Sequence, residues 1–325
     1  MPDLSDIHDA RLAIAHKIRR TPLVRSDSLS ARIGAPVYLK FEHHQITGSF
    51  KLRGATYAVH RLSAEQRAKG VVAVSTGNHG RALAQAAKDA GVRCVVCMSS
   101  LVPKNKVEAI GALGAEIRIV GASYDEAEVE ADRLVAEDGL TLLPAFDHPH
   151  VIAGQGTLGL EVMEALPRIE TLIVPLSGGG LIAGVALAAK TIRPSLRVIG
   201  VTMEFGAAMY ESLKAGRPVP VEERPSLADA LGGGIGLDNR YTFPMARDLV
   251  DHVHLVSESQ IGDAIHHAYW QERQVIEGSG AAGIAALLAG LVDDPGTTAV
   301  IVSGCNIDMD LHKRVIDGEA VDLGS

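Results

Sequence analysis

The chain has 325 residues, of which 47% are hydrophobic and 22% charged, a composition typical of a globular protein with about two domains of roughly 100–200 residues each. Its net charge is −8 and no block of lysine and arginine is visible, so we expect no nucleic-acid partner. The sequence contains neither an apolar run of about 18 residues nor the apolar segment of a secretory signal, so we expect no membrane span and a cytoplasmic protein.

Short apolar runs alternate with longer segments along most of the chain. The short runs predict strands, and the segments between them, several of which end at a glycine, predict helices. The predicted strands cover residues 36–42, 71–75, 93–98, 115–121, 141–146, 171–177, 197–203 and 298–304. Strands that alternate with helices are typical of parallel sheets covered on both faces, so the expected fold class is α/β with two doubly wound domains.

The series divides into two units. Residues 61–145 are expected to form a small domain. Residues 146–325 are expected to form a large domain together with residues 1–60, which are too short to fold alone. Residues 217–245 are rich in proline and glycine and predict a long ordered loop, and such loops are often functional.

A single lysine, Lys51, follows the small residues Thr47, Gly48 and Ser49 at the start of a predicted helix. Such a lysine can simply lie in solvent. Held out of water, its ammonium form is disfavoured and the neutral amine becomes a nucleophile.

The segment "STGNHG", residues 75–80, joins a predicted strand to a predicted helix. Ligands of doubly wound sheets bind at such strand ends. The backbone N–H groups here could hold a carboxylate, and Asn78 could donate to a ring oxygen. The alternative is an ordinary helix cap formed by Ser75 or Asn78.

Cys94 and Cys97 form a C-x-x-C pair inside a predicted strand. Residues i and i+3 of a strand point to opposite faces, so we expect free thiols and no shared metal ion. The thirteen histidines show no metal-ligand spacing, and no metal site is expected.

A glycine-rich loop, "SGGGLIAG" at residues 177–184, follows another predicted strand. Its glycines let backbone N–H groups approach an anion at the positive end of the next helix, and a phosphate is the natural ligand. One alternative is a tight turn that needs glycine only for packing. Another is a dinucleotide fingerprint made by Gly178, Gly180 and Gly184 with Glu204, which would indicate an NAD-dependent enzyme.

The last candidate loop is "VSGCN", residues 302–306. It places the hydroxyl of Ser303 at the same edge of the predicted sheet. By itself this segment predicts only a turn.

Together the motifs "TGSFKLRGA", "STGNHG", "SGGGLIAG" and "VSGCN", in this order, resemble those of the fold-type II pyridoxal-phosphate enzymes. The closest branch is that of threonine dehydratase and serine racemase, and the resemblance covers about residues 5–320. It implies a tryptophan synthase β-like fold with pyridoxal 5'-phosphate between the two domains. The NAD alternative leaves Lys51 and Asn78 unexplained.

The resemblance also implies roles for individual residues. Lys51 would form the Schiff base, Phe50 and Ser49 would shape the turn that presents it, Asn78 would meet the phenolic oxygen, and Ser303 the pyridine nitrogen. The phosphate loop would comprise Ser177, Gly178, Gly179, Gly180 and Leu181. The substrate carboxylate would be bound by Ser75, Thr76, Gly77 and His79.

The implied activity is that of a dehydratase, or ammonia-lyase, which eliminates water from a β-hydroxy α-amino acid such as L-threonine or L-serine. Three longer stretches, "VCMSSLVPKNKVEAIGALGAEIRIVGAS", "HVIAGQGTLGLE" and "LADALGGGIGLDNRYTF", resemble dehydratases of hydroxyectoine utilisation. They imply a ring-opened hydroxyectoine derivative as a possible substrate. We expect a small-molecule amino-acid substrate and a homo-oligomer, either a dimer or a tetramer.

Two alternatives from other classes stay open: an amino-acid racemase and a non-catalytic ligand-binding relative. The presence of Lys51 disfavours the second. Serine racemases carry a serine at position 76 as the base on the second face of Cα, whereas Thr76 keeps the hydroxyl but adds a methyl group, which disfavours efficient racemisation.

Two further departures from the family concern residues outside the four motifs. Metal-binding members have acidic residues near the positions of Thr202 and Ala208, and these are absent here, so no divalent-ion site is expected. His43 and His44 stand where relatives have asparagine and an apolar residue. The sequence assigns them no role.

Overall fold

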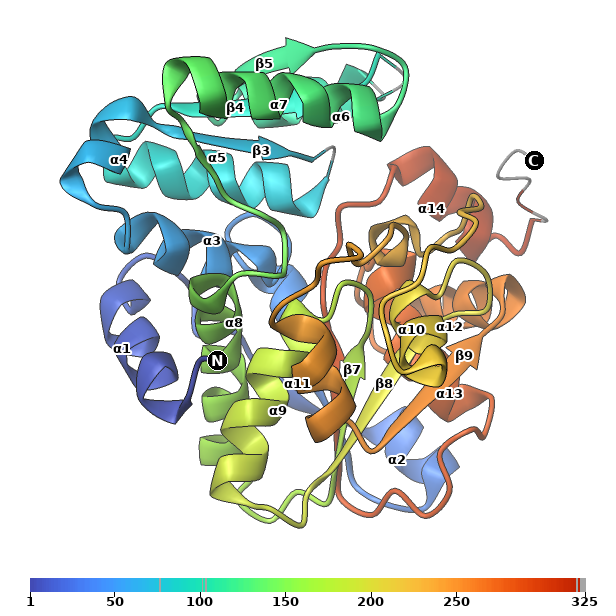
Figure 1. Cartoon of the computed structure of the whole chain (residues 1–325). Helices are drawn as coiled ribbons and strands as arrows, with labels where there is room; N and C mark the ends of the chain where they lie inside the picture. The colour runs from blue at the N-terminus through green and yellow to red at the C-terminus, as the bar shows by residue number, and fades with distance from the viewer. Residues whose placement is uncertain (76, 101, 103, 320, 322–325) are drawn as a thin grey trace.

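The computed structural model describes residues 1–75, 77–100, 102, 104–319 and 321. Within this part of the chain the strands form two separate sheets (Figure 1). The larger sheet has the strand order β1 (Leu23–Ser26), β2 (Val37–Phe41), β10 (Thr298–Val302), β7 (Thr171–Pro175), β8 (Arg197–Met203) and β9 (His252–Val256). The smaller sheet has the order β5 (Glu116–Ile119), β4 (Cys94–Met98), β3 (Val71–Val74) and β6 (Thr141–Leu142).

Both sheets are parallel apart from one edge strand. In the larger sheet only β1 is antiparallel, and it pairs with β2. The other neighbours, including β10 with β2 and with β7, are parallel, as are all pairs of the smaller sheet. The predicted α/β class with parallel sheets is confirmed.

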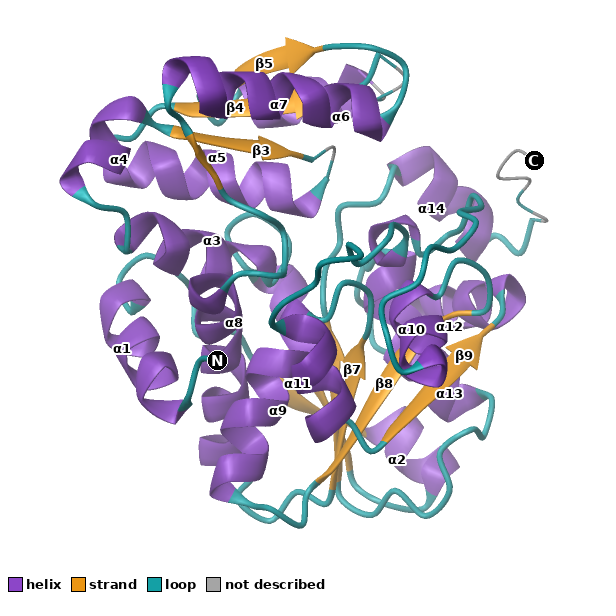
Figure 2. Cartoon of the chain, in the orientation of Figure 1, coloured by secondary structure: helices purple, strands orange, loops and turns teal. Residues whose placement is uncertain are grey.

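Helices cover both faces of the smaller sheet (Figure 2). The core on one face holds side chains of α3 (Lys51–His60), α5 (Asn78–Ala90) and α6 (Lys104–Gly111), and the core on the other holds side chains of α7 (Tyr124–Asp138). Cys94 belongs to the first core and Cys97 to the second, so their predicted opposite orientation is confirmed. The short helix α4 (Ala64–Lys69) precedes β3.

The larger sheet is covered in the same way. One face packs against α8 (Pro149–Ala165), α9 (Gly180–Ile192), α10 (Ala208–Ala215) and α11 (Thr242–Leu249). The other packs against α2 (Asp27–Ile33), α12 (Glu258–Trp270), α13 (Gly278–Leu288) and α14 (Met309–Ile316). The N-terminal helix α1 (Leu4–Ile14) packs against α8. In the described residues no helix combines the length and apolar character needed to span a membrane.

Several predicted boundaries change in the structure. β6 ends at Leu142 and not at residue 146, because Pro144 has no N–H to donate to the neighbouring strand. The edge strands β1 and β9 were not predicted, since their partly exposed residues do not form a continuous apolar run. The long loop expected over 217–245 is ordered but ends earlier, where α11 begins at Thr242, and it contains the short helix η2 (Asp229–Leu231).

A buried ion network ties α3 to the larger sheet. Arg53 of α3 is fully buried, and its guanidinium donates to Glu42 at 2.7 Å (Nε to Oε2) and to Glu161 of α8 at 2.7 Å (Nη1 to Oε1). Lys40 of β2 donates to the same Glu161 at 2.5 Å (Nζ to Oε2). The two cations and two carboxylates balance, so no charge of this network is buried without an opposite charge beside it. Because α3 also contributes to the core of the smaller sheet, the domain division at residue 60 stays a prediction.

Candidate active site

One cavity collects residues from distant parts of the chain at the carboxyl ends of β7 and β10. All nine residues that the sequence assigned to a cofactor line it, together with six that it did not assign. The lining residues are Phe50, Lys51, Asn78, Phe146, Pro175, Ser177, Gly178, Gly179, Gly180, Leu181, Ala230, Leu231, Glu277, Ser279 and Ser303. The structure therefore brings the predicted residues together, and their individual roles stay predictions.

Lys51 is the first residue of α3 and is partly buried at this cavity. Its Nζ donates a hydrogen bond to the carbonyl oxygen of Ala145 at 2.9 Å and lies 5.3 Å from the centre of the Phe50 ring. Burial lowers the pKa of Lys51 to about 8, although the negative charge of Glu277 opposes this shift. A neutral amine is thus much easier to form here than on a lysine in solvent.

The turn before Lys51 is tied directly to the Ser303 loop. Gly48 has φ +75°, a left-handed conformation that favours glycine, and a Cβ there would lie 2.8 Å from Oδ1 of Asn306. Ser49 forms an isolated β-bridge with Gly304, and the Phe50 N–H donates to the Ser303 carbonyl at 3.1 Å. These backbone contacts place Lys51 and Ser303, which are far apart in the sequence, on one cavity.

The glycine-rich loop leads from β7 into the first turn of α9. Gly179 is the N-cap residue, has φ +88° and offers no side-chain cap, so the positive helix end is open to an anion. A Cβ on Gly178 would lie 2.3 Å from the ring of Phe146, so glycine is also needed here for packing. The packing explanation therefore applies at Gly178, and phosphate binding by this loop stays a prediction. Gly184, the third glycine of the dinucleotide alternative, instead lies against α8, where a Cβ would meet the Ile152 carbonyl oxygen at 2.2 Å.

Asn78 lines the cavity but is held by two residues that the sequence did not single out. Its Nδ2 donates to Oε1 of Glu277 at 2.7 Å, and its Oδ1 accepts from Nδ2 of Asn306 at 2.5 Å. The N–H of Asn306 donates to the other carboxylate oxygen of Glu277 at 2.9 Å. The only sequence feature that could have indicated Glu277 is that it is a single acidic residue directly before the apolar, glycine- and alanine-rich helix α13.

Glu277 has unusual electrostatics for a carboxylate. Its side chain is 3% exposed, and burial, followed by the negative charge of Asp229, raises its pKa to about 7. The hydrogen bonds from Asn78 and Asn306 act in the opposite direction because they favour the charged form. Glu277 therefore changes its charge near neutral pH beside the cavity.

Three of the four residues predicted to bind a substrate carboxylate, namely Ser75, Gly77 and His79, lie at or just before the start of α5. The hydroxyl of Ser75 accepts from the Gly80 N–H at 3.0 Å, so this side chain bonds a backbone N–H group in the first turn of α5. Gly77 is the N-cap residue, and a Cβ there would meet nothing within 4 Å. His79 is buried, its Nε2 lies 2.8 Å from the Leu143 carbonyl oxygen, and burial lowers its pKa to about 4, so it is neutral. Thr76 lies outside the described residues.

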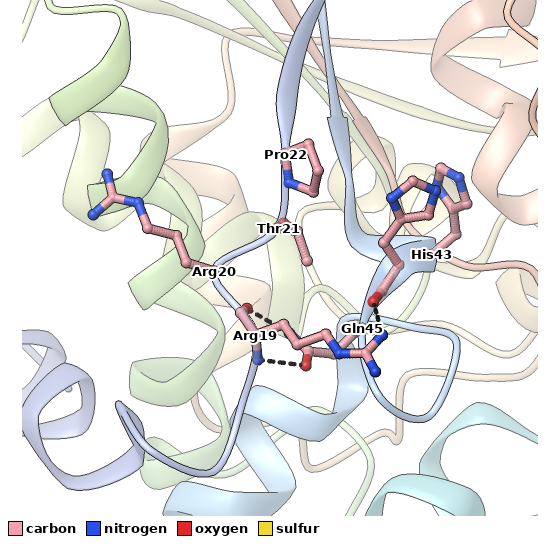
Figure 3. A pocket seen from close by; sticks show the side chains of 7 residues that line it. Arg19, Arg20, Thr21, Pro22, His43 and Gln45 are labelled. Carbon is pink, nitrogen blue, oxygen red and sulfur yellow. Dashed lines mark hydrogen bonds between the residues drawn. The ribbon is translucent and has the colours of Figure 1, made fainter.

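His43 and His44 border a different hollow. Figure 3 shows it with Arg19 and Gln45, whose side-chain and backbone groups exchange two hydrogen bonds of 2.8 and 2.9 Å. The Nε2 atoms of both histidines lie about 3 Å from Oε1 of Gln274. Neither histidine lines the cavity at Lys51, so the structure gives them no contact through which to select a substrate there.

The cavity fits pyridoxal phosphate on its own chemistry. It offers an amine of lowered pKa for an aldehyde, an uncapped helix end for a phosphate, and the Asn78 amide and Ser303 hydroxyl for the polar atoms of a ring. The hydroxyl of Ser279, which also lines it, is buried without a hydrogen-bond partner in the protein. In the described residues no three His, Cys, Asp or Glu side chains gather in a group that could hold a metal ion.

Comparison with known proteins agrees with this chemistry. A family model described as "Pyridoxal-phosphate dependent enzyme" matches residues 14–304, and the chain belongs to this family. The fold is therefore that of an enzyme that uses pyridoxal phosphate, and the NAD alternative is wrong.

Curated relatives indicate which type of pyridoxal-phosphate enzyme this chain resembles. A protein of Sinorhizobium fredii named "Putative threonine dehydratase" is 58% identical over 97% of this chain and 95% of its own length. The "L-threonine ammonia-lyase" of Thermotoga maritima is 40% identical and covers 100% of this chain and 80% of its own length. These similarities make the chain a threonine dehydratase-like lyase of the pyridoxal-phosphate family.

Solved structures give the same fold. Maize serine racemase superimposes with a TM-score of 0.92 at 36% identity, over 98% of this chain and 97% of its own. The processed form of threonine deaminase isoform 2 from Solanum lycopersicum gives a TM-score of 0.88 at 33% identity, over 99% of this chain and 96% of its own. Dehydratases and racemases thus share this architecture, and the choice between them depends on the site.

Proposed function

We propose that this enzyme eliminates water from a β-hydroxy α-amino acid and releases a 2-oxo acid and ammonia, with L-threonine and L-serine as the simplest substrates. The observation that carries the proposal is the position of Lys51, a lysine of lowered pKa on the same cavity as the open glycine loop and Ser303. The names of the dehydratase and ammonia-lyase relatives support the reaction type.

In this proposal the cofactor and the residues of the cavity have separate roles in the reaction. Bound pyridoxal phosphate supplies an electron sink for the bond that breaks at the substrate Cα. The first turn of α9 and its glycine loop would hold its phosphate, the Asn78 amide would donate to its phenolic oxygen, and Ser303 would meet its pyridine nitrogen. These residues all line the cavity. Because Ser303 is a neutral hydroxyl and not a carboxylate, it would leave that nitrogen without a proton, which would favour prompt loss of the β-substituent.

Proton movement is assigned to Lys51. Its neutral Nζ would accept the proton from Cα and would then give a proton to the β-hydroxyl, which leaves as water. The enamine product then becomes an imine, which water hydrolyses to the 2-oxo acid and ammonia. We propose that Ser75, Gly77 and His79 hold the substrate carboxylate, and we retain Thr76 as a catalytic and substrate-binding candidate.

The direct test measures 2-oxo acid and ammonia from L-threonine and L-serine. The wild type should release both products in equal amounts, and Lys51→Ala should release neither. The exposed lysine variant Lys214→Ala is the matched control and should keep full activity. Equal turnover by Lys51→Ala would contradict the proposal.

A racemase is the second candidate, because the overlay with maize serine racemase is close. The test incubates L-serine in deuterated water and separates the enantiomers of the recovered amino acid. We expect elimination to exceed racemisation, since Thr76 carries an additional methyl group compared with serine. Accumulation of D-serine faster than of 2-oxo acid would reverse this assignment.

The natural substrate is proposed to be a larger β-hydroxy amino acid, namely ring-opened hydroxyectoine with its α-amine free. A covalent link to the cofactor requires a primary amine, and the intact ring locks the α-nitrogen in a cyclic amidine. Purified enzyme should therefore release 2-oxo acid from the ring-opened γ-acyl compound and none from intact hydroxyectoine. Activity on L-threonine alone would instead indicate an ordinary threonine dehydratase.

We also propose that the enzyme is a cytoplasmic homo-oligomer, a dimer or a tetramer, composed of the small domain 61–145 and a large domain of residues 1–60 and 146–325. Sedimentation equilibrium of the purified protein measures the oligomeric state. A monomer at micromolar concentration would contradict that part of the proposal.

A further inference from the structure

Asn306 does not line the cavity, but its side-chain amide forms hydrogen bonds with several residues, and one of them, Asn78, does line it. Its Oδ1 accepts from Nη1 of Arg81 at 2.8 Å. Its Nδ2 donates to the carbonyl oxygen of Thr47 at 2.9 Å and to Oδ1 of Asn78 at 2.5 Å. Three segments, the turn before Lys51, the start of α5 and the Ser303 loop, thus meet at this one amide.

The chemistry of these partners fixes the direction of every hydrogen bond. A guanidinium can only donate, so the oxygen of the Asn306 amide must face Arg81. Its nitrogen then faces the Thr47 carbonyl oxygen and Asn78, which must present its own oxygen. The nitrogen of Asn78 is left on the side of the Glu277 carboxylate, which accepts from it.

This chain of bonds leaves Asn78 in one orientation. One N–H of its amide is used by Glu277 and its oxygen is used by Asn306, so the second N–H remains for a partner in the cavity that Asn78 lines. The opposite orientation would place the Asn78 oxygen against the carboxylate and its nitrogen against the Asn306 nitrogen. The contact between the two nitrogens would be repulsive at any pH, and the contact with Glu277 would be repulsive whenever that side chain is ionised.

We propose that Asn306 is a positioning residue that fixes the Asn78 amide, so that Asn78 presents its free N–H to the phenolic oxygen of pyridoxal phosphate. The inference rests on the role proposed for Asn78. Arg81 acts one step further away because it orients Asn306. A purely structural role for Asn306, in which it only joins three segments, is the competing explanation.

The test uses the bound cofactor and not turnover, so that it stays informative even if the proposed reaction is wrong. Asn306→Asp keeps the shape and the bond from Arg81 but replaces both donated N–H groups by an acceptor. The Asn78 amide is expected to rotate and withdraw its N–H from the cofactor. The absorbance maximum of the bound cofactor should shift, and the apoprotein should bind pyridoxal phosphate roughly tenfold more weakly, the loss of about one hydrogen bond to a charged group.

Two further variants separate positioning from structure. Cys305→Ala alters the neighbouring residue, whose thiol points to the His43 carbonyl oxygen, and should leave spectrum and affinity unchanged. In the Asn78→Ala background Asn306→Asp should have almost no further effect on cofactor affinity, because its effect passes through Asn78. The thermal midpoint of the apoprotein is measured for each variant.

The measurements distinguish a positioning role of Asn306 from a purely structural one. Non-additive effects of positions 78 and 306 on the cofactor, with little change in apoprotein stability, support the proposal. Equal effects of Asn306→Asp in both backgrounds, or an unchanged spectrum, overturn it. If Asn306→Asp does not fold, Arg81→Leu replaces it, because this variant frees the Asn306 amide to rotate. Arg81→Leu should weaken cofactor binding in the wild-type background but not in the Asn78→Ala background. Equal effects in both backgrounds would also overturn the proposal.

Discussion

At the scale of single residues, two titratable side chains at the cavity are shifted toward neutral pH from opposite sides. Burial lowers the pKa of Lys51 to about 8 and raises that of Glu277 to about 7, because it disfavours the charged form of each. The negative charge of Glu277 offsets part of the shift of Lys51. Such shifted groups are common where proteins bind and transform ligands.

The first prediction concerns the reactivity of Lys51. Only the neutral amine attacks an aldehyde, so covalent capture of pyridoxal phosphate by the apoprotein should rise with pH and level off above about pH 8. Below that value the rate should fall about tenfold per pH unit. The measurement is the rate of borohydride-trapped adduct on Lys51 by mass spectrometry between pH 6 and 10. A midpoint near the ordinary lysine value of about 10.4 would show that the amine is solvated.

The second prediction concerns Glu277 and stability. Its pKa is raised on folding, so the folded state binds the extra proton and is stabilised by low pH. The free energy of unfolding of the wild-type apoprotein should therefore decline, relative to Glu277→Gln, as pH rises from about 4.5 to 7. A shift of this size corresponds to about 3 kcal/mol. Urea unfolding of both proteins at several pH values checks this, and a constant difference would contradict it.

At the scale of secondary-structure elements, the buried network of Arg53, Glu42, Glu161 and Lys40 fixes the start of α3 against β2 and α8. Lys51 is two residues before Arg53 on the same helix. The position of the cavity lysine therefore depends on charges that are themselves shielded from solvent.

The third prediction follows from this network. Arg53→Leu leaves two buried carboxylates with a single cation, so we expect a loss of about 3–5 kcal/mol in the free energy of unfolding. Arg133→Ala is the control, because its contacts with Glu130 and Glu137 lie on the surface and should be worth below about 1 kcal/mol. Urea unfolding measures both. Similar losses for the two variants would show that the buried network adds little.

At the scale of the whole molecule, the cavity is built from elements of both sheets. Lys51 starts a helix that packs in the core of the smaller sheet, while the glycine loop and Ser303 follow strands of the larger one. An ion pair of 3.0 Å between Lys106 of α6 and Asp229 of η2 also links the two parts near the cavity. A ligand bound here contacts both.

The fourth prediction is that pyridoxal phosphate stabilises the complete fold. A ligand that binds only the folded state at 100 times its Kd contributes about 2.7 kcal/mol, which for a chain of this size raises the thermal midpoint by about 4 °C. Calorimetry of the apoprotein and the holoenzyme measures the shift. Lys51→Ala with cofactor should show a smaller one, and no difference between apoprotein and holoenzyme would contradict a site that joins both sheets.

Much of this organisation could be predicted from the sequence, because its signals are local. The strands 71–74, 94–98 and 171–175 are short apolar runs, and their residues are almost all buried in a sheet covered on both faces. The order of four short motifs was sufficient to identify the family, and the nine residues that they predict to bind the cofactor line one cavity.

What only the tertiary structure decided depends on contacts between residues far apart in the chain. Glu277 lies 199 positions from Asn78, and Asn306 lies 228 positions from it, so no local pattern indicates that they meet. The edge strands were missed because an exposed edge needs no apolar run. Helix α3 belongs to two cores because one of its faces packs against α5 and the other against α8 and α1. The direction of the Asn78 amide follows from the same long-range contacts, since the sequence names the side chain but only its neighbours determine which way it points.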